Sequence, residues 1–246
     1  MLLEAHAEVG GRPFDRVEAL RLTYADASAQ DLLRGLLAEY PGEVALVSSF
    51  GADSAVLLHM VARIDSDLPV LFAETQMLFE ETLAYQRELS TQLGLTNVRS
   101  IRPDAGDLAR LDPQDVLHGV DPDACCVIRK VAPLDRALRR YPVAISGRKR
   151  FQSATRAELE VFESELGQVR VSPLASWGAR DIAAYLDAHE LPRHPLVARG
   201  FASIGCEPCT TAVAPGEASR AGRWRGHAKT ECGIHFGPDG ALRRAS

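Results

Sequence analysis

Short apolar segments alternate with amphipathic segments along most of this chain, and that alternation limits its folds more than any other feature. The apolar runs that predict buried strands lie at 43–50, 68–74, 97–103 and 141–147, with a weaker one at 168–174. The runs with helical spacing lie at 25–40, 55–64 and 78–94, and around 126–139 and 180–189. Strands alternating with helices predict an α/β fold with a mainly parallel central sheet flanked by helices.

The charge and the beginning of the chain argue against several classes of protein. With 246 residues and a formal net charge of −5 the chain is mildly acidic, which argues against non-specific binding along nucleic acid. The start MLLEAHAEVGG lacks the features of a signal peptide, and no apolar stretch is long enough to span a bilayer. We expect a cytoplasmic protein with no membrane or nucleic-acid partner. The sequence leaves open whether it forms a homo-oligomer.

The segment SSFGADS lies between the first predicted strand and the helix after it. A loop at this point offers backbone N–H groups and the positive end of a helix to an anion. It is not a Walker A loop, because no Gly-Lys-Ser/Thr follows, and its serines and glycine resemble the pyrophosphate loop of ATP pyrophosphatases. An ordinary strand-to-helix turn capped by Ser54 is the alternative. The candidate binding residues are Ser48, Ser49, Gly51 and Ser54.

A run of cations follows the fourth predicted strand, in the segment SGRKRFQSATRAE at 146–158. Cations at the carboxyl end of a strand suit the recognition of phosphate or sulfate. A solvated basic face is the alternative, and the position at a strand end favours ligand binding. The cations of this run are Arg148, Lys149, Arg150 and Arg156.

Four of the five cysteines come in two pairs, in a chain that lacks the features of a secreted disulfide framework. Cys206 and Cys209 form a CxxC turn, typical of a zinc half-site, a redox pair or a structural turn. Cys125 and Cys126 are adjacent, so on a regular helix their side chains diverge by about 100° and reach one centre only at a helix end or distortion. Zinc prefers spaced ligands, whereas an iron–sulfur cube tolerates adjacent ones better. Two core cysteines with an unrelated CxxC are the alternative.

Several motifs together resemble the assimilatory adenylylsulfate (APS) reductases, within the wider family that includes the PAPS reductases. They are CCVIRKVAPL at 125–134, RFQSATRAE at 150–158, SPLASW at 172–177, GFASIGCEPCT at 200–210 and KTECGIH at 229–235. The resemblance runs from the pyrophosphate loop almost to the end of the chain and implies an adenine nucleotide alpha-hydrolase-like fold. The chain departs from the family at Glu74-Thr75-Gln76, where Asp-Thr-Gly is usual, and at Lys149-Arg150, where paired arginines are usual.

The resemblance implies a cofactor and a nucleophile. A 4Fe–4S cluster would be bound by Cys125, Cys126, Cys206 and Cys209, and Cys232 would attack the sulfur of APS, expel AMP and become S-sulfonated. Thioredoxin or glutaredoxin would then release sulfite, in assimilatory sulfate reduction toward cysteine. PAPS-specific relatives typically lack both cysteine pairs, so the full set favours APS, with PAPS as main or additional substrate left open. With four cysteines on the cluster, the final disulfide would link Cys232 to the donor.

The same resemblance assigns roles to the cations and to the tail. Lys229 and His235 would favour the thiolate at position 232, whereas Glu231 would oppose it, and His235 would also lie at the substrate. Residues 1–205 would form an α/β nucleotide-binding domain including the first cysteine pair. Residues 206–246 would form the CxxC turn and a mobile catalytic tail. The cations expected to bind phosphate and sulfate are Lys130, Lys149, Arg150, Arg220 and Arg223.

Two other functions use some of the same features. An ATP pyrophosphatase-type nucleotidyl transferase or tRNA thiolation enzyme would use the loop for ATP and leaves Cys232 unexplained. A non-catalytic nucleotide-binding module would hold structural zinc on the four paired cysteines.

Overall fold

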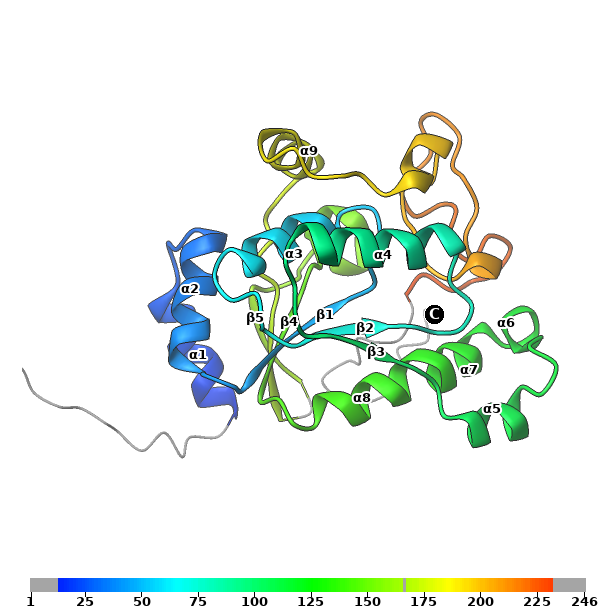
Figure 1. The fold of residues 1–246 in the computed structure, drawn as a ribbon, viewed down its shortest axis with the longest axis horizontal. Coiled ribbons are helices and arrows are strands. Elements are labelled where there is room, and N and C mark those ends of the chain that lie inside the picture. Colours follow the sequence, from blue (N-terminus) through cyan, green and yellow to red (C-terminus); the bar gives the residue numbers. More distant parts are fainter. Residues whose placement is uncertain (1–12, 166, 232–246) are drawn as a thin grey trace, which may run out of the picture.

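The computed structural model describes residues 13–165 and 167–231, and within them the strands form one six-stranded sheet (Figure 1). The strands are β1 (Val44–Ser48), β2 (Val70–Ala73), β3 (Val98–Ile101), β4 (Val143–Ser146), β5 (Phe162–Glu165) and β6 (Gln168–Val171). Their spatial order is β3-β2-β1-β4-β6-β5, and every neighbouring pair is parallel except β5 with β6. The predicted α/β fold with a mainly parallel sheet is confirmed.

Helices connect the strands and cover both faces of the sheet. They are α1 (Pro13–Thr23), α2 (Ala29–Glu39), α3 (Ser54–Ala62), α4 (Glu80–Gln92), α5 (Ala105–Leu111), α6 (Leu117–Val120), α7 (Pro122–Cys126), α8 (Ala132–Leu138) and α9 (Ala179–Ala188). A π-helix, Val127–Val131, joins α7 to α8. Among the described residues, no helix has the length and apolarity needed to cross a membrane.

The core has two layers because successive side chains of a strand point to opposite faces. Val44 and Leu46 of β1 pack with the helices α2 and α3, whereas Ala45 between them packs with Leu134 and Leu138 of α8. Figure 1 shows the same division, with α3 and α4 on one side of the sheet and α8 on the other. A strand buried on both faces reads as a continuous apolar run, which is why the sequence predicts β1, β2 and β4 well.

The edge strand β5 and the helix α1 were not predicted from the sequence. The strand segment FESE carries two carboxylates and lacks an apolar run, and only Phe162 is buried there. Phe162 packs against Tyr24, the residue after α1, with ring centroids 6.0 Å apart, so the element depends on a contact distant in sequence.

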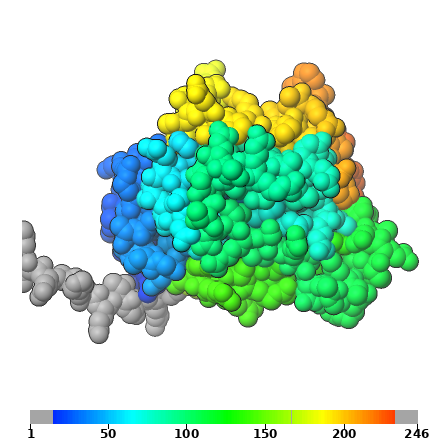
Figure 2. Space-filling view, in the orientation of Figure 1, coloured from blue at the N-terminus to red at the C-terminus, as the bar shows by residue number. Residues whose placement is uncertain are grey.

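The connection order creates a crevice beside β1. From β1 the chain runs outward through β2 and β3, then returns to place β4 on the other side of β1. The loops after β1 and β4 therefore diverge, and ligands of open α/β sheets bind at such a point. After α9 the chain forms a C-terminal segment, 192–231, with only short 3-10 helices, which lies beside α4 in Figures 1 and 2. Its Arg199 forms an ion pair with Glu81 of α4.

Candidate functional site

A cavity of about 420 Å³ opens at the carboxyl ends of β1 and β4. The loop after β1 and the loop after β4 form two of its walls, and the C-terminal segment forms another. All four predicted loop residues, Ser48, Ser49, Gly51 and Ser54, line it. The sequence prediction of a ligand site at these strand ends therefore coincides with a cavity.

The loop after β1 is held in a fixed, partly strained shape. Phe50 has a left-handed backbone with φ of 49°, and its N–H donates to the Ser48 hydroxyl at 3.1 Å. Its buried ring meets Phe72 of β2 edge-on, which ties the loop to the core. A Cβ on Gly51 would lie 3.4 Å from the Ile204 carbonyl oxygen, so glycine allows the C-terminal segment to approach closely. Asp53, not Ser54, occupies the N-cap of α3, so the alternative of an ordinary turn capped by Ser54 is wrong in its capping residue.

The basic run after β4 does not aim all its charges into the cavity. Lys149 lines the cavity but is buried with 2% of its surface exposed, and its ammonium lies 3.1 Å from Asp53 and donates to the Gly147 carbonyl. Burial lowers the pKa of Lys149 in spite of Asp53. Arg148 lines the cavity and pairs with Glu163. Arg150 instead donates to the Leu159 carbonyl at 2.8 Å and is not among the described residues that line the cavity.

Three other predicted cations, Lys130, Arg220 and Arg223, do line the cavity. The Arg223 guanidinium lies 4.4 Å from the ring centre of Trp224, a stacked cation–π geometry. A Cβ on Gly205 would lie 2.2 Å from that guanidinium, so Gly205 makes room for it. The Arg223 Nε is buried and has no hydrogen-bond partner among the described residues. The arrangement leaves donor capacity beside the cavity, as an anion site needs.

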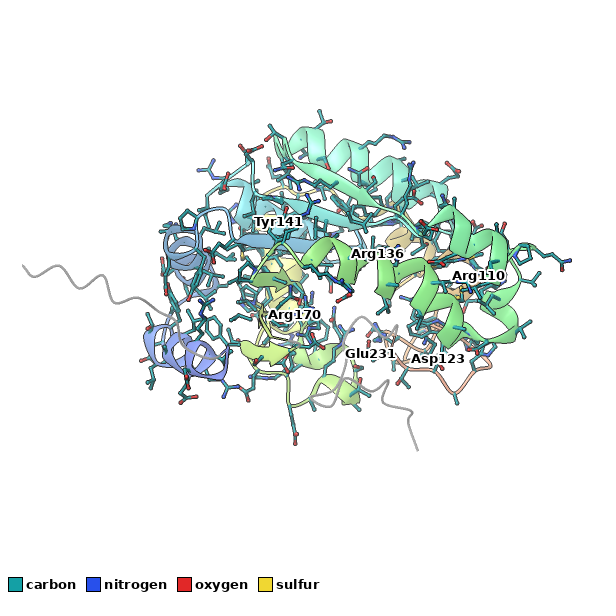
Figure 3. The ribbon with its side chains drawn as sticks, turned by 90° about the horizontal axis from the view of Figure 1, so that it is seen from below. Arg110, Asp123, Arg136, Tyr141, Arg170 and Glu231 are labelled. Atoms are coloured by element: carbon teal, nitrogen blue, oxygen red, sulfur yellow. The ribbon has the colours of Figure 1, made fainter. Side chains whose placement is uncertain are left out.

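Arg156 also lines the cavity, and the tail reaches it there through Glu231. The guanidinium donates to both Glu231 carboxylate oxygens, from Nε at 2.9 Å and from the second terminal nitrogen at 2.8 Å. Burial would raise the pKa of the Glu231 carboxyl, but Arg156 and Arg220 outweigh it and the pKa is lowered. Figure 3 shows Glu231 on the same side of the molecule as Asp123, which pairs with Lys229.

Sequence reasoning placed Arg156 in the basic run but did not select it as a site residue. It also treated Glu231 only as an opposing charge. Their contact joins residues 75 positions apart, so no local motif indicates it. The strand-end position of the basic run was the available signal.

The adjacent cysteines lie where a regular helix ends. Helix α7 finishes at Cys126 and continues as the π-helix Val127–Val131. A π-helix has a wider turn than an α-helix and is frequent at functional sites. The helix end that adjacent cysteines need in order to reach one centre is thus present at Cys125-Cys126.

The two cysteine pairs approach each other across the molecule. The Cys206 sulfur lies 3.2 Å from the Thr75 hydroxyl at the end of β2, and a β-bridge joins Cys206 to Leu78. Burial, then the nearby Cys206, raises the pKa of the Cys125 thiol to about 12, and burial with Cys206 also raises that of Cys209. Within residues 13–165 and 167–231, no three His, Cys, Asp or Glu side chains are grouped closely enough for one metal ion.

The departure at Glu74-Thr75-Gln76 has its own contacts. Glu74 accepts from Arg102 at 2.5 Å and from the backbone N–H of Gln76 at 2.7 Å. Gln76 adopts φ of 62°, the left-handed conformation for which glycine is favoured. Arg129, 2% exposed, donates to the Thr75 carbonyl and pairs with the buried Asp112. The corner therefore supports the cysteine region and does not line the cavity formed by the described residues.

Two predicted residues, Cys232 and His235, lie outside the residues that the structure describes. Their predicted roles stay predictions.

Comparisons with known proteins agree with the geometry. Residues 43–212 match the phosphoadenosine phosphosulfate reductase domain family. A Mesorhizobium japonicum protein named adenosine 5'-phosphosulfate reductase is 56% identical over 194 residues, 79% of this chain and 76% of that protein. A Chelativorans sp. protein of the same name is 47% identical over 240 residues, 96% of this chain and 98% of that one. The crystal structure of PAPS reductase from Candida auris, a phosphate complex, has TM-score 0.66 at 20% identity, covering 86% and 99% of the two chains, and bears on the fold alone.

Proposed function

This chain belongs to the phosphoadenosine phosphosulfate reductase family, and we propose that it reduces APS to sulfite and AMP with electrons from a thioredoxin-type thiol. The curated relatives named above carry the name of that activity and match most of the chain. The proposal places the protein in the cytoplasm, in assimilatory sulfate reduction toward cysteine.

One observation carries the proposal: a nucleotide-sized cavity has serines and a glycine on one side and cations on the other, among them Arg223, whose buried Nε has no partner among the described residues. APS needs both, because its adenylate phosphate and its sulfate are separate anionic groups. The Ser48–Ser54 loop offers N–H groups and the start of α3 to one anion. Lys130 and Arg223 offer positive charge to the other, and they stabilise the charge that develops on the leaving phosphate. Lys149, which pairs with Asp53, holds the two loops together.

The proposed reaction balances in three steps. The Cys232 thiolate attacks the sulfur of APS; a sulfur–sulfur bond forms, the bond between sulfur and the phosphate oxygen breaks, and AMP leaves. A thiolate of the donor then attacks the Cys232 sulfur and releases sulfite, forming a mixed disulfide. The second thiol of the donor resolves it, so the donor dithiol supplies two electrons and regenerates Cys232.

We propose further that Cys125, Cys126, Cys206 and Cys209 hold a 4Fe–4S cluster. The donor set supports this proposal, because burial and the nearby Cys206 raise the pKa of the Cys125 and Cys209 thiols, and a positive centre bound to them would favour their thiolates. When bound, the cluster would fix the sulfur positions and tune the charge beside the sulfate. Lys130, four residues after Cys126, faces the cavity from this region.

Sulfite release tests the reaction. With APS and thioredoxin, the protein as purified with its cofactor should release sulfite, and Cys232→Ser should lower the rate at least ~1000-fold, since the nucleophile is removed. Mass spectrometry should find the S-sulfonate adduct on Cys232 when the thiol donor is left out. A serine variant with full turnover would refute the mechanism.

The same assay with PAPS decides the substrate. We expect APS to be preferred, and a PAPS rate equal to or above the APS rate would assign the chain to the alternative. Hydrolysis or transfer from ATP, without sulfite from either sulfonucleotide, would favour a nucleotidyl transferase.

A further inference from the structure

We propose that Glu231 is a positioning residue that docks the chain beside the cavity immediately before Cys232. The inference rests on the proposed function for its consequence, and on the contacts of Glu231 for its geometry. Glu231 is joined by one peptide bond to the proposed nucleophile, so fixing its carboxylate restricts where the next residue can lie.

The carboxylate is held by five donors from two parts of the chain. One oxygen accepts from the Ser153 and Thr155 hydroxyls, each at 3.1 Å, and from Arg156 Nε. The other accepts from the terminal nitrogens of Arg156 at 2.8 Å and Arg220 at 3.2 Å. We call Ser153, Thr155 and Arg156 the socket.

Contacts within and beside the socket orient its donors toward the carboxylate. Ser153 immediately precedes a short 3-10 helix, Ala154–Arg156, which carries Thr155 and Arg156. This turn places the Ser153 and Thr155 hydroxyls 2.8 Å apart, on the same side of the backbone as the carboxylate that both contact. Gln152 accepts from the remaining terminal nitrogen of Arg156 and fixes the plane of the guanidinium. Two-pronged arginine–carboxylate contacts fix direction as well as distance.

Adjacent contacts hold the same stretch of tail. Arg220 donates to the Thr230 carbonyl at 2.8 Å, so it holds both the backbone and the carboxylate. Lys229, 6% exposed, pairs with Asp123 of α7. Residues 229–231 therefore bridge the cysteine-bearing helix and the basic loop after β4.

Docking of Glu231 determines which charges beside the cavity are paired with each other. Glu231 neutralises Arg156 and Arg220 instead of acting as a free anion beside the thiol. Lys130 and Arg223 then remain as cavity cations that the dock does not engage. Loss of the Glu231 charge should slow the attack by the thiol more than it weakens substrate binding, because the two cations that meet the substrate are untouched.

The experiment uses the protein with its bound cofactor and compares wild type with Glu231→Gln. Without a thiol donor, the rate at which APS converts Cys232 to its S-sulfonate should fall about 10- to 100-fold, the cost of a charge-assisted anchor. The APS concentration for half-maximal rate should change less than about threefold. Glu231→Asp keeps the charge on a shorter side chain and should recover part of the rate.

A matched control is available in the same segment. Glu217 accepts two bonds from Arg225 at 3.2 and 3.0 Å, but this exposed pair lies outside the cavity lining. Glu217→Gln should leave the rate of adduct formation unchanged.

A second measurement does not depend on the reaction. Trypsin cleaves after lysine, and the docked Lys229 side chain is 6% exposed and paired. Glu231→Gln should accelerate cleavage after Lys229, whereas Glu217→Gln should not. Three results in Glu231→Gln would each overturn the dock. They are an unchanged rate of cleavage after Lys229, an unchanged rate of adduct formation, and an unchanged rate of adduct formation with a lower APS concentration for half-maximal rate. If wild type forms no adduct, the proposed function fails and the cleavage comparison alone decides the dock.

Discussion

The central sheet and the C-terminal segment 192–231 are built from different interactions. In the sheet, Val44, Val70 and Val143 are buried to 1% exposure or less on one face, and Ala45, Leu71 and Ala144 are buried on the other. In the C-terminal segment the apolar cluster is small, with Leu196 and Ile204 packed against Phe79, and ion pairs such as Arg220 with Glu231 and Lys229 with Asp123 hold the stretch beside the cavity. Apolar packing does not depend on the protonation of individual groups and is not screened by ionic strength, whereas contacts between charges are sensitive to both. We therefore expect that loss of buried apolar side chains destabilises the sheet, whereas changes of charge or of pH disrupt contacts of the C-terminal segment.

The largest effect should follow from a cavity in the sheet's apolar layer. Leu36 of α2 is completely buried in that layer. Leu36→Ala should lower the free energy of unfolding by about 4 kcal/mol, because it loses apolar burial and leaves a cavity. Urea unfolding, followed by circular dichroism, measures this loss of unfolding free energy.

The matched control is the same change on the surface. Leu22 is 75% exposed, and Leu22→Ala should change the unfolding free energy by less than about 0.5 kcal/mol. Equal losses in the two variants would contradict the idea that apolar burial holds this region.

A smaller effect, dependent on pH, is expected where the two regions meet at His194. Its Nδ1 accepts the Leu196 N–H at 3.2 Å, so the Nε2 hydrogen points to the Thr82 hydroxyl of α4 at 3.0 Å. Burial lowers the pKa of His194 from 6.5 to about 4, in spite of Glu81. The unfolded chain therefore binds a proton first as pH falls, and stability is lost between pH 6.5 and about 4. The loss should approach about 3 kcal/mol.

The measurement is the unfolding free energy of wild type and His194→Asn across that pH range. Asparagine keeps an acceptor near the Leu196 N–H but does not titrate, so the variant should lose about 3 kcal/mol less than wild type between pH 6.5 and pH 4. Parallel pH curves for the two proteins would show that other groups set the acid sensitivity.

The same division explains what the sequence could predict of the fold. The strands β1, β2 and β4 are buried on both faces, so their apolar runs predicted them without tertiary information. The strand β5 was missed because its burial depends on Phe162 meeting Tyr24 across the chain. Helix α7 illustrates a middle case. The adjacency of Cys125 and Cys126 meant that both could reach one centre only at a helix end or distortion, but the sequence could not specify that a π-helix follows them.

For the candidate site, local motifs located the loops but not the partners of their side chains. Gly51 and the serines line the cavity because the strand places them there. Arg150 and Arg156 belong to one basic run, yet a carbonyl engages the first and the tail engages the second. Charge alone predicts that cations lie near the strand end, whereas the fold determines which of them face the cavity.

The smallest effect should come from one methyl group in the C-terminal segment. Gly222 accepts the Thr211 N–H at 2.8 Å, and a Cβ there would lie 2.0 Å from the Thr211 carbonyl oxygen. Because that obstacle is backbone, Gly222→Ala must shift the stretch that carries Arg220 and Arg223. Sulfite release should fall about tenfold, equivalent to about 1.4 kcal/mol, with a sheet as stable as in wild type. Gly119→Ala is the control, since its Cβ would meet nothing within 4 Å, and it should keep the wild-type rate. If Gly222→Ala lowered the melting temperature of the whole protein instead, the C-terminal segment would have to be part of the cooperative core, and the contrast between the two regions would not hold.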